Sequence, residues 1–113
     1  MAADCLFCRI ARREIPANIV AENDSLIALR DVNPQAPTHI LVIPREHVAD
    51  VTAVRDPMLL GQMAMFASEL AAREGIDKSG FRTVINTNAD AGQTVFHLHL
   101  HLLGGRPMHW PPG

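Results

Sequence analysis

The stretch HLHLHLLGG, residues 97–105, alternates histidine with leucine near the end of a chain that has six histidines in all. Successive side chains of a β-strand point to opposite faces of its sheet, so this alternation predicts a strand over residues 97–103. The leucines would face a core, and the histidines would share the other face. The leucines are Leu98, Leu100 and Leu102, and the histidines are His97, His99 and His101. Three groups with unperturbed pKa values of about 6.5 concentrate proton-transfer and nucleophilic capacity in one place.

A metal site is the main alternative use of these imidazoles, because His-x-His is a frequent ligand pair. On a strand, residues two apart are separated by about 6.6 Å and residues four apart by about 13 Å, so one ion could meet at most two of them. The tail GGRPMHWPPG, residues 104–113, contributes no carboxylate or cysteine that could complete a tetrahedral site. At least one imidazole is therefore left for chemistry.

Length and composition indicate a globular chain that builds its own core. The chain has 113 residues, 48% of them hydrophobic and 19% charged, with a formal net charge of −2. This composition lacks the excess of positive charge that nucleic-acid-binding proteins have, so any nucleotide partner would be small. The N-terminal residues lack the apolar run of a signal peptide, and no segment has the length needed to cross a bilayer. We therefore expect a cytoplasmic protein without a membrane partner.

Strand and helix signals along the chain predict an α+β domain with a mainly antiparallel sheet of five strands. A short helix over residues 6–14 would end before Pro16, and a long helix would begin at Asp56-Pro57 and stop at Gly75. Two strands within residues 18–31 would flank an Asn-Asp-Ser turn. The other strands lie within residues 37–47, 81–87 and 97–103, and the first of these is apolar enough to be central.

Polar residues just before the histidine strand are suited to an anion. Asn86 follows a predicted strand, and Gly92, Gln93 and Thr94 precede the histidines. Backbone N–H groups, a carboxamide and a hydroxyl around one concavity can hold non-bridging phosphate oxygens with little basic charge nearby. Taken alone, AGQT is more often a turn, and only its place beside three histidines makes it a phosphate site.

The motif HLHLHLL at residues 97–103, in the longer segment GQTVFHLHLHLLGGRPMHWPPG, resembles the signature of the histidine-triad (HIT) family, and the tail resembles its Hint-like nucleotide-binding branch. Residues 14–17 (EIPA), 31–47 and Asn86 extend the resemblance over nearly the whole chain. It implies a single HIT domain over 1–113 with 104–113 as a C-terminal tail. It also implies a homodimer in which two five-stranded sheets form one continuous sheet, with Trp110 packed on the partner subunit near its active site.

The resemblance implies a purine nucleoside phosphoramidase that releases an AMP-like monophosphate through a nucleotidyl-histidine intermediate, without a redox cofactor. His99 would be the nucleophile, and His101 and His39 would complete the catalytic cluster. Other implied nucleotide contacts are Asp31 to the ribose, Asn86, Gly92, Gln93 and Thr94 to the phosphate, and Leu6, Phe7, Ile10, Leu29, Val32 and Leu41 to the base. Asp31 could instead cap a turn, and the apolar residues could be ordinary core. A dinucleoside-polyphosphate hydrolase and a largely non-catalytic nucleotide-binding or protein-interaction module remain alternatives.

The pair Cys5-x-x-Cys8 has three interpretations, namely a redox dithiol, two idle thiols and half of a zinc site. The surrounding sequence does not supply the usual context of a redox motif. In bacterial-type members of the family, the remaining zinc ligands correspond here to His47 and His97. The resemblance thus implies a structural Cys₂His₂ zinc site, in which His97 binds metal while His99 performs chemistry.

Overall fold

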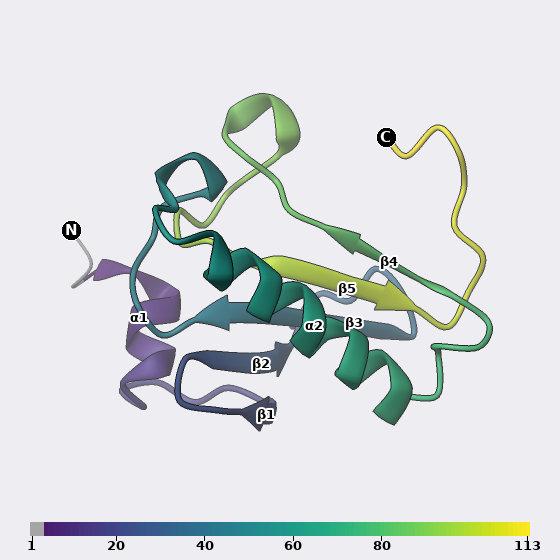
Figure 1. Cartoon of the computed structure of the whole chain (residues 1–113), viewed down its shortest axis with the longest axis horizontal. Coiled ribbons are helices and arrows are strands. Elements are labelled where there is room, and N and C mark those ends of the chain that lie inside the picture. The colour runs from purple at the N-terminus through teal and green to yellow at the C-terminus, as the bar shows by residue number, and fades with distance from the viewer. Residues whose placement is uncertain (1–3) are drawn as a thin grey trace.

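The computed structural model describes residues 4–113 as a five-stranded sheet with helices on its two faces (Figure 1). The strand order is β1-β2-β3-β5-β4, and every neighbouring pair is antiparallel. The elements run in the order α1 (Leu6–Ala11), β1 (Ile19–Glu22), β2 (Leu26–Arg30), β3 (Thr38–Pro44), α2 (Pro57–Arg73), β4 (Phe81–Val84) and β5 (Leu100–Gly104), with 3₁₀ turns at Val51–Ala53 and Ala89–Ala91. The predicted α+β class with one short and one long helix is confirmed.

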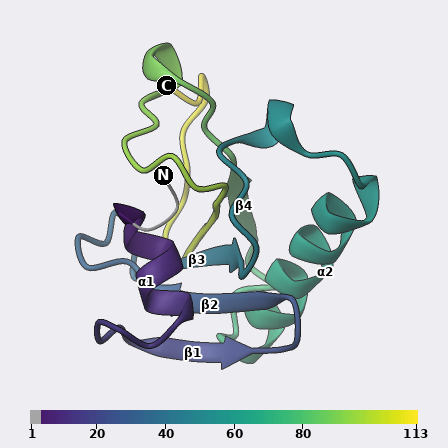
Figure 2. The same cartoon turned by 90° about the vertical axis from the view of Figure 1, so that its left-hand side faces the viewer.

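The sheet separates two apolar layers, and Figure 2 shows α1 on one side of it and α2 on the other. All seven residues of β3 are buried, as expected for the central strand. On the α2 face, Met63, Phe66 and Leu70 of the helix pack with residues of β3 and β5. On the α1 face, Phe7 and Ile10 join a smaller cluster of residues from β2 and β3.

The long helix begins and ends where its sequence signals predict. The Asp56 side chain accepts a hydrogen bond from the Met58 amide at 2.9 Å, and Pro57 occupies the first helical position. Its chain reverses at Gly75, whose φ of +74° is a conformation that glycine adopts without strain. Within the described residues, neither helix is long and apolar enough to span a membrane.

The histidine strand begins later than predicted, so the prediction is wrong for its first three residues. Pairing with β3 starts at Val42↔Leu100, and residues 97–99 lie ahead of the ladder. Pro44, two positions beyond Val42 on β3, has no N–H to donate, and its carbonyl accepts from the His97 ring at 2.8 Å. The alternation of faces nevertheless extends upstream of the strand, because Leu98 is buried in the α2 layer.

Two other predicted elements are also shorter than expected. The first helix ends at Ala11 rather than at residue 14, because Arg13 adopts a φ of +59° and the Glu14 amide bonds back to the Arg9 carbonyl. The strand predicted over residues 81–87 stops at Val84. Asn86 consequently lies in the connection to β5 and not within the sheet.

Candidate active site

An apolar cavity of about 490 Å³ opens on the α1 face of the sheet, and His99 and His101 form part of its wall. All six residues expected to surround a nucleotide base line this cavity. They are Leu6, Phe7, Ile10, Leu29, Val32 and Leu41, with Asp31 and Thr94 also in the wall. The remaining wall comes from Ile15, Pro16, Ala17, Asn18, Arg30 and Val95, which the sequence analysis did not single out. The sequence signal for Ile15, Pro16 and Ala17 is the EIPA segment, whose residues carry no predicted role.

His99 lies in the wall of the cavity, and a hydrogen bond to one of its ring nitrogens fixes the tautomer of the neutral imidazole. Its Nδ1 lies 2.7 Å from the carbonyl oxygen of His97, and a carbonyl can only accept, so Nδ1 carries the proton. In the neutral ring, Nε2 is therefore the nitrogen with the free lone pair. Phe7 packs edge-on against the ring with centroids 5.2 Å apart, which limits the directions in which the imidazole can turn. This geometry is that of a nucleophile held in one tautomer.

His39 and His101 form a hydrogen-bonded pair whose protons are also fixed. The Gln35 amide donates to His39 Nδ1 at 3.0 Å, so the His39 proton is on Nε2, which lies 2.9 Å from His101 Nδ1. His101 thus accepts at Nδ1 and carries its own proton on Nε2. Burial, with the neighbouring His99 and His39, lowers the pKa of His101 to about 4. Burial also lowers the pKa of His39, although the Asp31 carboxylate at 3.5 Å works in the opposite direction.

Asp31 caps a turn and also lines the cavity. One carboxylate oxygen accepts from the Asn33 amide at 2.8 Å, which caps the turn before Pro34. The other oxygen faces His39, and the residue lines the cavity. A carboxylate at the cavity wall can accept two hydrogen bonds from a vicinal diol.

The predicted phosphate contacts are only partly brought together. Thr94 lines the cavity, whereas Asn86 and Gly92 are not among its lining residues. The Gln93 carboxamide is used inside the protein, because its oxygen accepts from the Asn88 amide at 2.8 Å and its nitrogen donates to two backbone carbonyls, those of Ala49 and Val95. The expectation that this side chain binds phosphate is corrected accordingly. Gln93 instead holds the loop in front of the histidines, since a buried carboxamide must satisfy its own hydrogen bonds.

The two cysteines and two further histidines meet behind His99. Their ligand atoms all lie within 4.8 Å of one another. His97 Nδ1 lies 3.2 Å from Cys5 Sγ and 3.5 Å from Cys8 Sγ, and His47 Nδ1 lies 3.3 Å from Cys8 Sγ. Because His97 donates from Nε2 to the Pro44 carbonyl, the nitrogen that faces the sulfurs is unprotonated. Burial and the adjacent Cys5 raise the pKa of the Cys8 thiol, so its thiolate form is disfavoured unless a cation lies beside it. This donor set fits a tetrahedral divalent metal.

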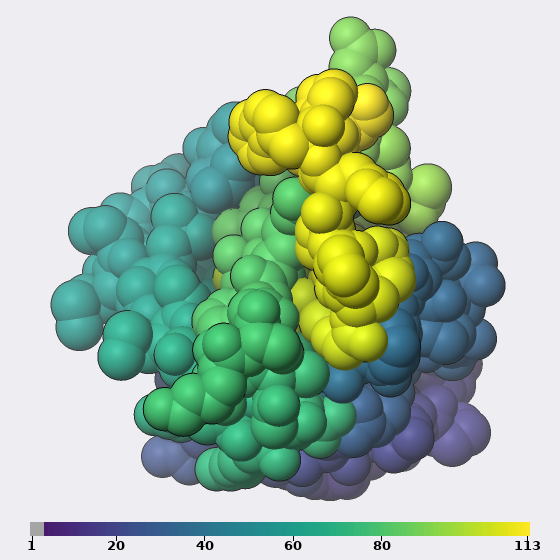
Figure 3. Space-filling view, turned by 90° about the vertical axis from the view of Figure 1, so that its right-hand side faces the viewer, coloured from purple at the N-terminus to yellow at the C-terminus, as the bar shows by residue number. Residues whose placement is uncertain are grey.

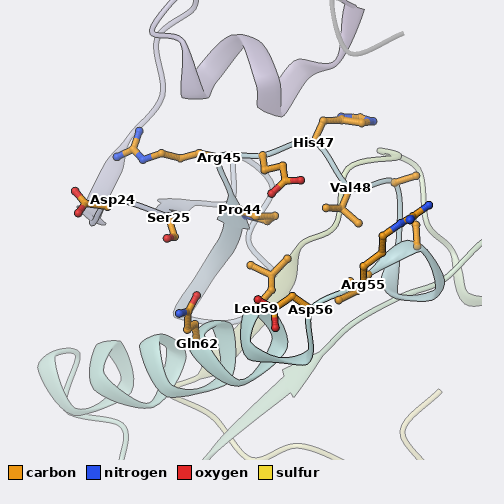
Figure 4. Close-up of a pocket in the computed structure, with 14 residues that line it drawn as sticks. Asp24, Ser25, Pro44, Arg45, His47, Val48, Arg55, Asp56, Leu59 and Gln62 are labelled. Carbon is orange, nitrogen blue, oxygen red and sulfur yellow. The ribbon is translucent and has the colours of Figure 1, made fainter.

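A second and larger hollow, of about 710 Å³, lies beside α2 and the segment that follows β3 (Figure 4). Its charged groups are partly engaged elsewhere, since Arg45 bonds to Glu22 at 2.6 Å and Asp56 caps α2. The one histidine in its wall is His47, whose ring points out of the hollow in Figure 4 and whose Nδ1 faces Cys8. Of the triad, His99 and His101 line the smaller, apolar cavity, and none of the three histidines lines this larger hollow.

The fold and this site together define the class of protein: an α+β domain in which a late antiparallel strand delivers alternating histidines to an apolar cavity. The HIT domain family matches residues 12–108, and this chain belongs to that family. A HIT-like protein of Synechocystis is 55% identical over the whole of both chains. The purine nucleoside phosphoramidase of Escherichia coli K12 is 49% identical over 111 residues, which cover 96% of this chain and 92% of that protein.

Solved structures agree with this assignment. The crystal structure of a HIT family hydrolase from Legionella pneumophila superposes with a TM-score of 0.94 at 51% identity, over 97% of this chain and all of the other. A histidine triad nucleotide-binding protein from Candida albicans superposes with a TM-score of 0.84 at 28% identity, over 96% of this chain and 83% of the other. The fold is thus shared across bacterial and fungal members at very different levels of identity.

Proposed function

We propose that this protein is a hydrolase that cleaves the P–N bond of purine nucleoside phosphoramidates and releases a nucleoside monophosphate. The observation that carries the proposal is the fixed tautomer of His99, whose unprotonated Nε2 belongs to a ring in the wall of a nucleotide-sized cavity. The 49% identity to the Escherichia coli phosphoramidase over nearly the whole chain supports the same reaction.

The reaction follows from the residues of the cavity. His99 Nε2 attacks phosphorus, the P–N bond breaks, and the leaving amine takes a proton from solvent. An amine accepts that proton more readily than an alkoxide does, which favours P–N substrates. The Nε2–H of His101 donates to a phosphate oxygen, and Asp31 accepts from the ribose hydroxyls. Water then attacks the nucleotidyl-histidine, the N–P bond breaks, and the monophosphate leaves while the water proton returns to solvent.

The direct test is turnover of adenosine 5′-phosphoramidate by the purified protein. We expect AMP and ammonia as products, and a covalent nucleotidyl adduct on His99 in samples quenched with denaturant at alkaline pH, where an N–P bond survives, and analysed by mass spectrometry. Diadenosine polyphosphates and acyl-adenylates assayed in parallel report on the breadth of leaving groups. Turnover confined to a diadenosine polyphosphate, with none of the phosphoramidate, would replace this proposal by the dinucleoside-polyphosphate hydrolase.

The Cys₂His₂ cluster is proposed to hold zinc, with Cys5, Cys8, His47 and His97 as ligands. The metal would supply a covalent cross-link between the N-terminal helix and the segments at the ends of β3 and β5, and it would take no part in the chemical steps. The unprotonated His97 Nδ1 facing two sulfurs supports this assignment. Two unpaired thiols also fit a reducing compartment such as the cytoplasm.

A homodimer that pairs two sheets is proposed as the assembled form. Strand β4 is an edge of the sheet, and an unpaired edge is a template for another strand. Phe81 at the start of β4 and Met65 on α2 are exposed apolar side chains, and Trp110 in the tail is 82% exposed. Analytical ultracentrifugation should give twice the mass of the chain, and a monomer at micromolar concentration would contradict the proposal.

A further inference from the structure

The tail is clasped to an active-site loop by a single arginine. Arg106 donates from Nε and Nη2 to the Gln35 carbonyl at 3.2 and 3.0 Å, and from Nη1 to the Pro107 carbonyl at 3.0 Å. The backbone approaches closely here, because a Cβ added at Gly105, whose φ is +90°, would lie 2.9 Å from Pro37. Figure 3 shows the yellow tail lying against the blue segment that contains this loop. The segment before β3 is therefore held from outside by the tail.

Gln35 contacts a histidine with the other side of its backbone. Its carbonyl accepts from Arg106, while its amide donates to His39 Nδ1. An amide N–H can only donate, so its position decides that His39 Nδ1 accepts and that Nε2 carries the proton. Nε2 in turn donates to His101 Nδ1. One unbroken chain of contacts thus runs from Arg106 through Gln35 and His39 to His101.

We propose that Arg106 is a positioning residue for the reaction, which acts through the Gln35 backbone to keep the His39–His101 pair in the tautomer that presents the His101 Nε2–H to the phosphate. Its kinetic consequences rest on the proposed phosphoramidase activity, whereas its effect on the tautomer does not. All three guanidinium contacts go to backbone carbonyls and none to a carboxylate. The residue therefore fixes the position of the backbone and does not neutralise a negative charge. Arginine suits this role because its planar fork can send two donors to one carbonyl in a fixed direction.

Loss of the clasp should change how His39 titrates. The groups that face the His39 ring are the Asp31 carboxylate, the His101 ring and the Gln35 amide. While the amide donates to Nδ1, that nitrogen cannot take a proton, and burial already holds the pKa of His39 below its usual value. When the amide moves away, Nδ1 becomes free and Asp31 favours the cation. The pKa of His39 then rises, and the acid limb of the pH–rate profile moves to higher pH.

The test compares Arg106→Ala with Arg82→Ala in the full-length protein. Arg82 on β4 also holds the tail, by donating to the His109 carbonyl at 3.0 Å, but it has no bond to the loop at Gln35. Nitrogen-15 spectra of the imidazole rings should show the Nε2–H tautomer at His39 in the wild type and in Arg82→Ala. In Arg106→Ala we expect exchange between tautomers at His39 and at His101.

The kinetic arm uses adenosine 5′-phosphoramidate over a range of pH. Arg106→Ala should lower kcat by about tenfold, a fraction of the ~10²- to 10⁴-fold that positioned proton-handling groups contribute. Its acid limb should move up by about one pH unit. Arg82→Ala should match the wild type in both respects, and Arg106→Lys, with one donor group and no fork, should fall between them.

Two results would overturn the proposal: an unchanged His39 tautomer in Arg106→Ala, or equal effects of Arg106→Ala and Arg82→Ala. Melting temperatures measured alongside separate a loosened site from an unfolded protein, because the tautomer is read only in samples that remain folded. If the wild type itself fails to turn over the substrate, the proposed function fails, and the tautomer spectra still decide the role of Arg106.

Discussion

Two clusters of ligand-type side chains flank His99, and they look alike by distance but not by protonation. Cys5, Cys8, His47 and His97 form one cluster, and Asp31, His39 and His101 form the other. In both, every ligand atom lies within 4.8 Å of the others. A search by residue type and distance would assign a metal to each of them.

The two clusters differ in the hydrogen bonds that backbone groups make to their histidines. A carbonyl, that of Pro44, accepts from His97 Nε2 and leaves a lone pair on the nitrogen that faces the sulfurs. An amide, that of Gln35, donates to His39 Nδ1 and leaves a proton on the nitrogen that faces His101. Metal binding through His39 Nε2 would require that proton to leave, either to form an imidazolate or to move to Nδ1 with loss of the Gln35 hydrogen bond. The first cluster is therefore arranged for a metal ion and the second for a proton, and the difference is made by backbone groups outside the clusters.

His99 belongs to neither cluster but is tied to the first by one hydrogen bond. Its Nδ1–H donates to the backbone carbonyl of His97, whose ring faces the sulfurs. His101, a member of the second cluster, lies next to His99, with the two ring centroids 5.0 Å apart. The proposed nucleophile is thus oriented from the first cluster, and in the proposed reaction it would face a substrate held from the second.

The largest effect is expected from His99 itself. Replacing His99 with Asn removes the nucleophile but leaves Asp31, Thr94 and the apolar wall that would hold the nucleotide. We expect kcat to fall by about 10³-fold or more, since a covalent catalyst without its nucleophile retains little turnover. AMP affinity, measured by calorimetry, should stay within about threefold of the wild type, a change of less than ~0.7 kcal/mol.

The matched control for this variant is His109→Asn, which changes an exposed imidazole in the tail. That variant should keep wild-type turnover. If His99→Asn retained more than about 1% of kcat, another group would have to be the nucleophile.

The next effect tests the comparison of the two clusters directly. Cys8→Ser should reduce the zinc content from about one per chain to near zero and lower the melting temperature by roughly 10 °C, because the binding energy of a structural metal is part of the folding energy. Asp31→Asn, which alters the other cluster, should leave the zinc content unchanged. Elemental analysis of protein purified without chelator provides the measurement. Equal zinc loss in both variants would mean that distance and not protonation decides where metal binds.

Much of this arrangement could be predicted from the sequence because its signals are local. The His–Leu alternation predicts the two faces of β5, and Asp56-Pro57 predicts the start of α2. Strand and helix ends could not be read in the same way, because they depend on partners. The strand begins at Leu100, and the Pro44 carbonyl on β3 accepts from the His97 side chain rather than from a backbone N–H of β5, which nothing near residue 97 signals.

The site residues also divide into those with a local sequence signal and those whose role depends on partners elsewhere in the chain. Histidines in a strand pattern and cysteines at a fixed spacing can be recognised from residue type. The use of Gln93 inside the loop, and the donation from Gln35 to His39, depend on where the backbone places N–H and C=O groups. Backbone groups leave no trace in the residue types of a motif, and they are what distinguishes the two clusters.

A smaller effect is expected from acidification. Burial lowers the pKa of His101 to about 4 and lowers that of His39, whereas an unfolded chain has histidine pKa values of about 6.5. Between these values the unfolded state binds more protons than the folded state, so the free energy of unfolding falls as the pH falls from about 6.5 toward 4. Above pH 7 this contribution is complete.

Urea unfolding at several pH values measures this dependence, and His101→Asn serves as the comparison. We expect the variant to show a shallower loss of stability between about pH 6.5 and 4, because one of the histidines whose pKa is lowered in the folded state is gone. An identical slope in both proteins would show that His101 does not contribute a depressed pKa to the folded state.

The smallest effect is expected from the end of the tail, and it tests how far the second cluster depends on it. Removing residues 107–113 keeps Arg106, and with it the two bonds to the Gln35 carbonyl that hold the His39 side of the site. It removes Trp110, which is 82% exposed and whose flanking prolines restrict the chain, so that little entropy is lost if the segment docks on a partner subunit. The base and ribose contacts remain with Asp31 and the apolar wall. We therefore expect AMP affinity to be unchanged, while relative kcat/KM among adenosine phosphoramidates with different amines changes by about tenfold, the lower end of what one methylene in an apolar pocket contributes. Steady-state kinetics on such a series and calorimetric titration with AMP are the measurements. A uniform loss on every substrate, together with weaker AMP binding, would show that the tail beyond Arg106 supports the fold or the dimer and has no part in choosing the leaving group.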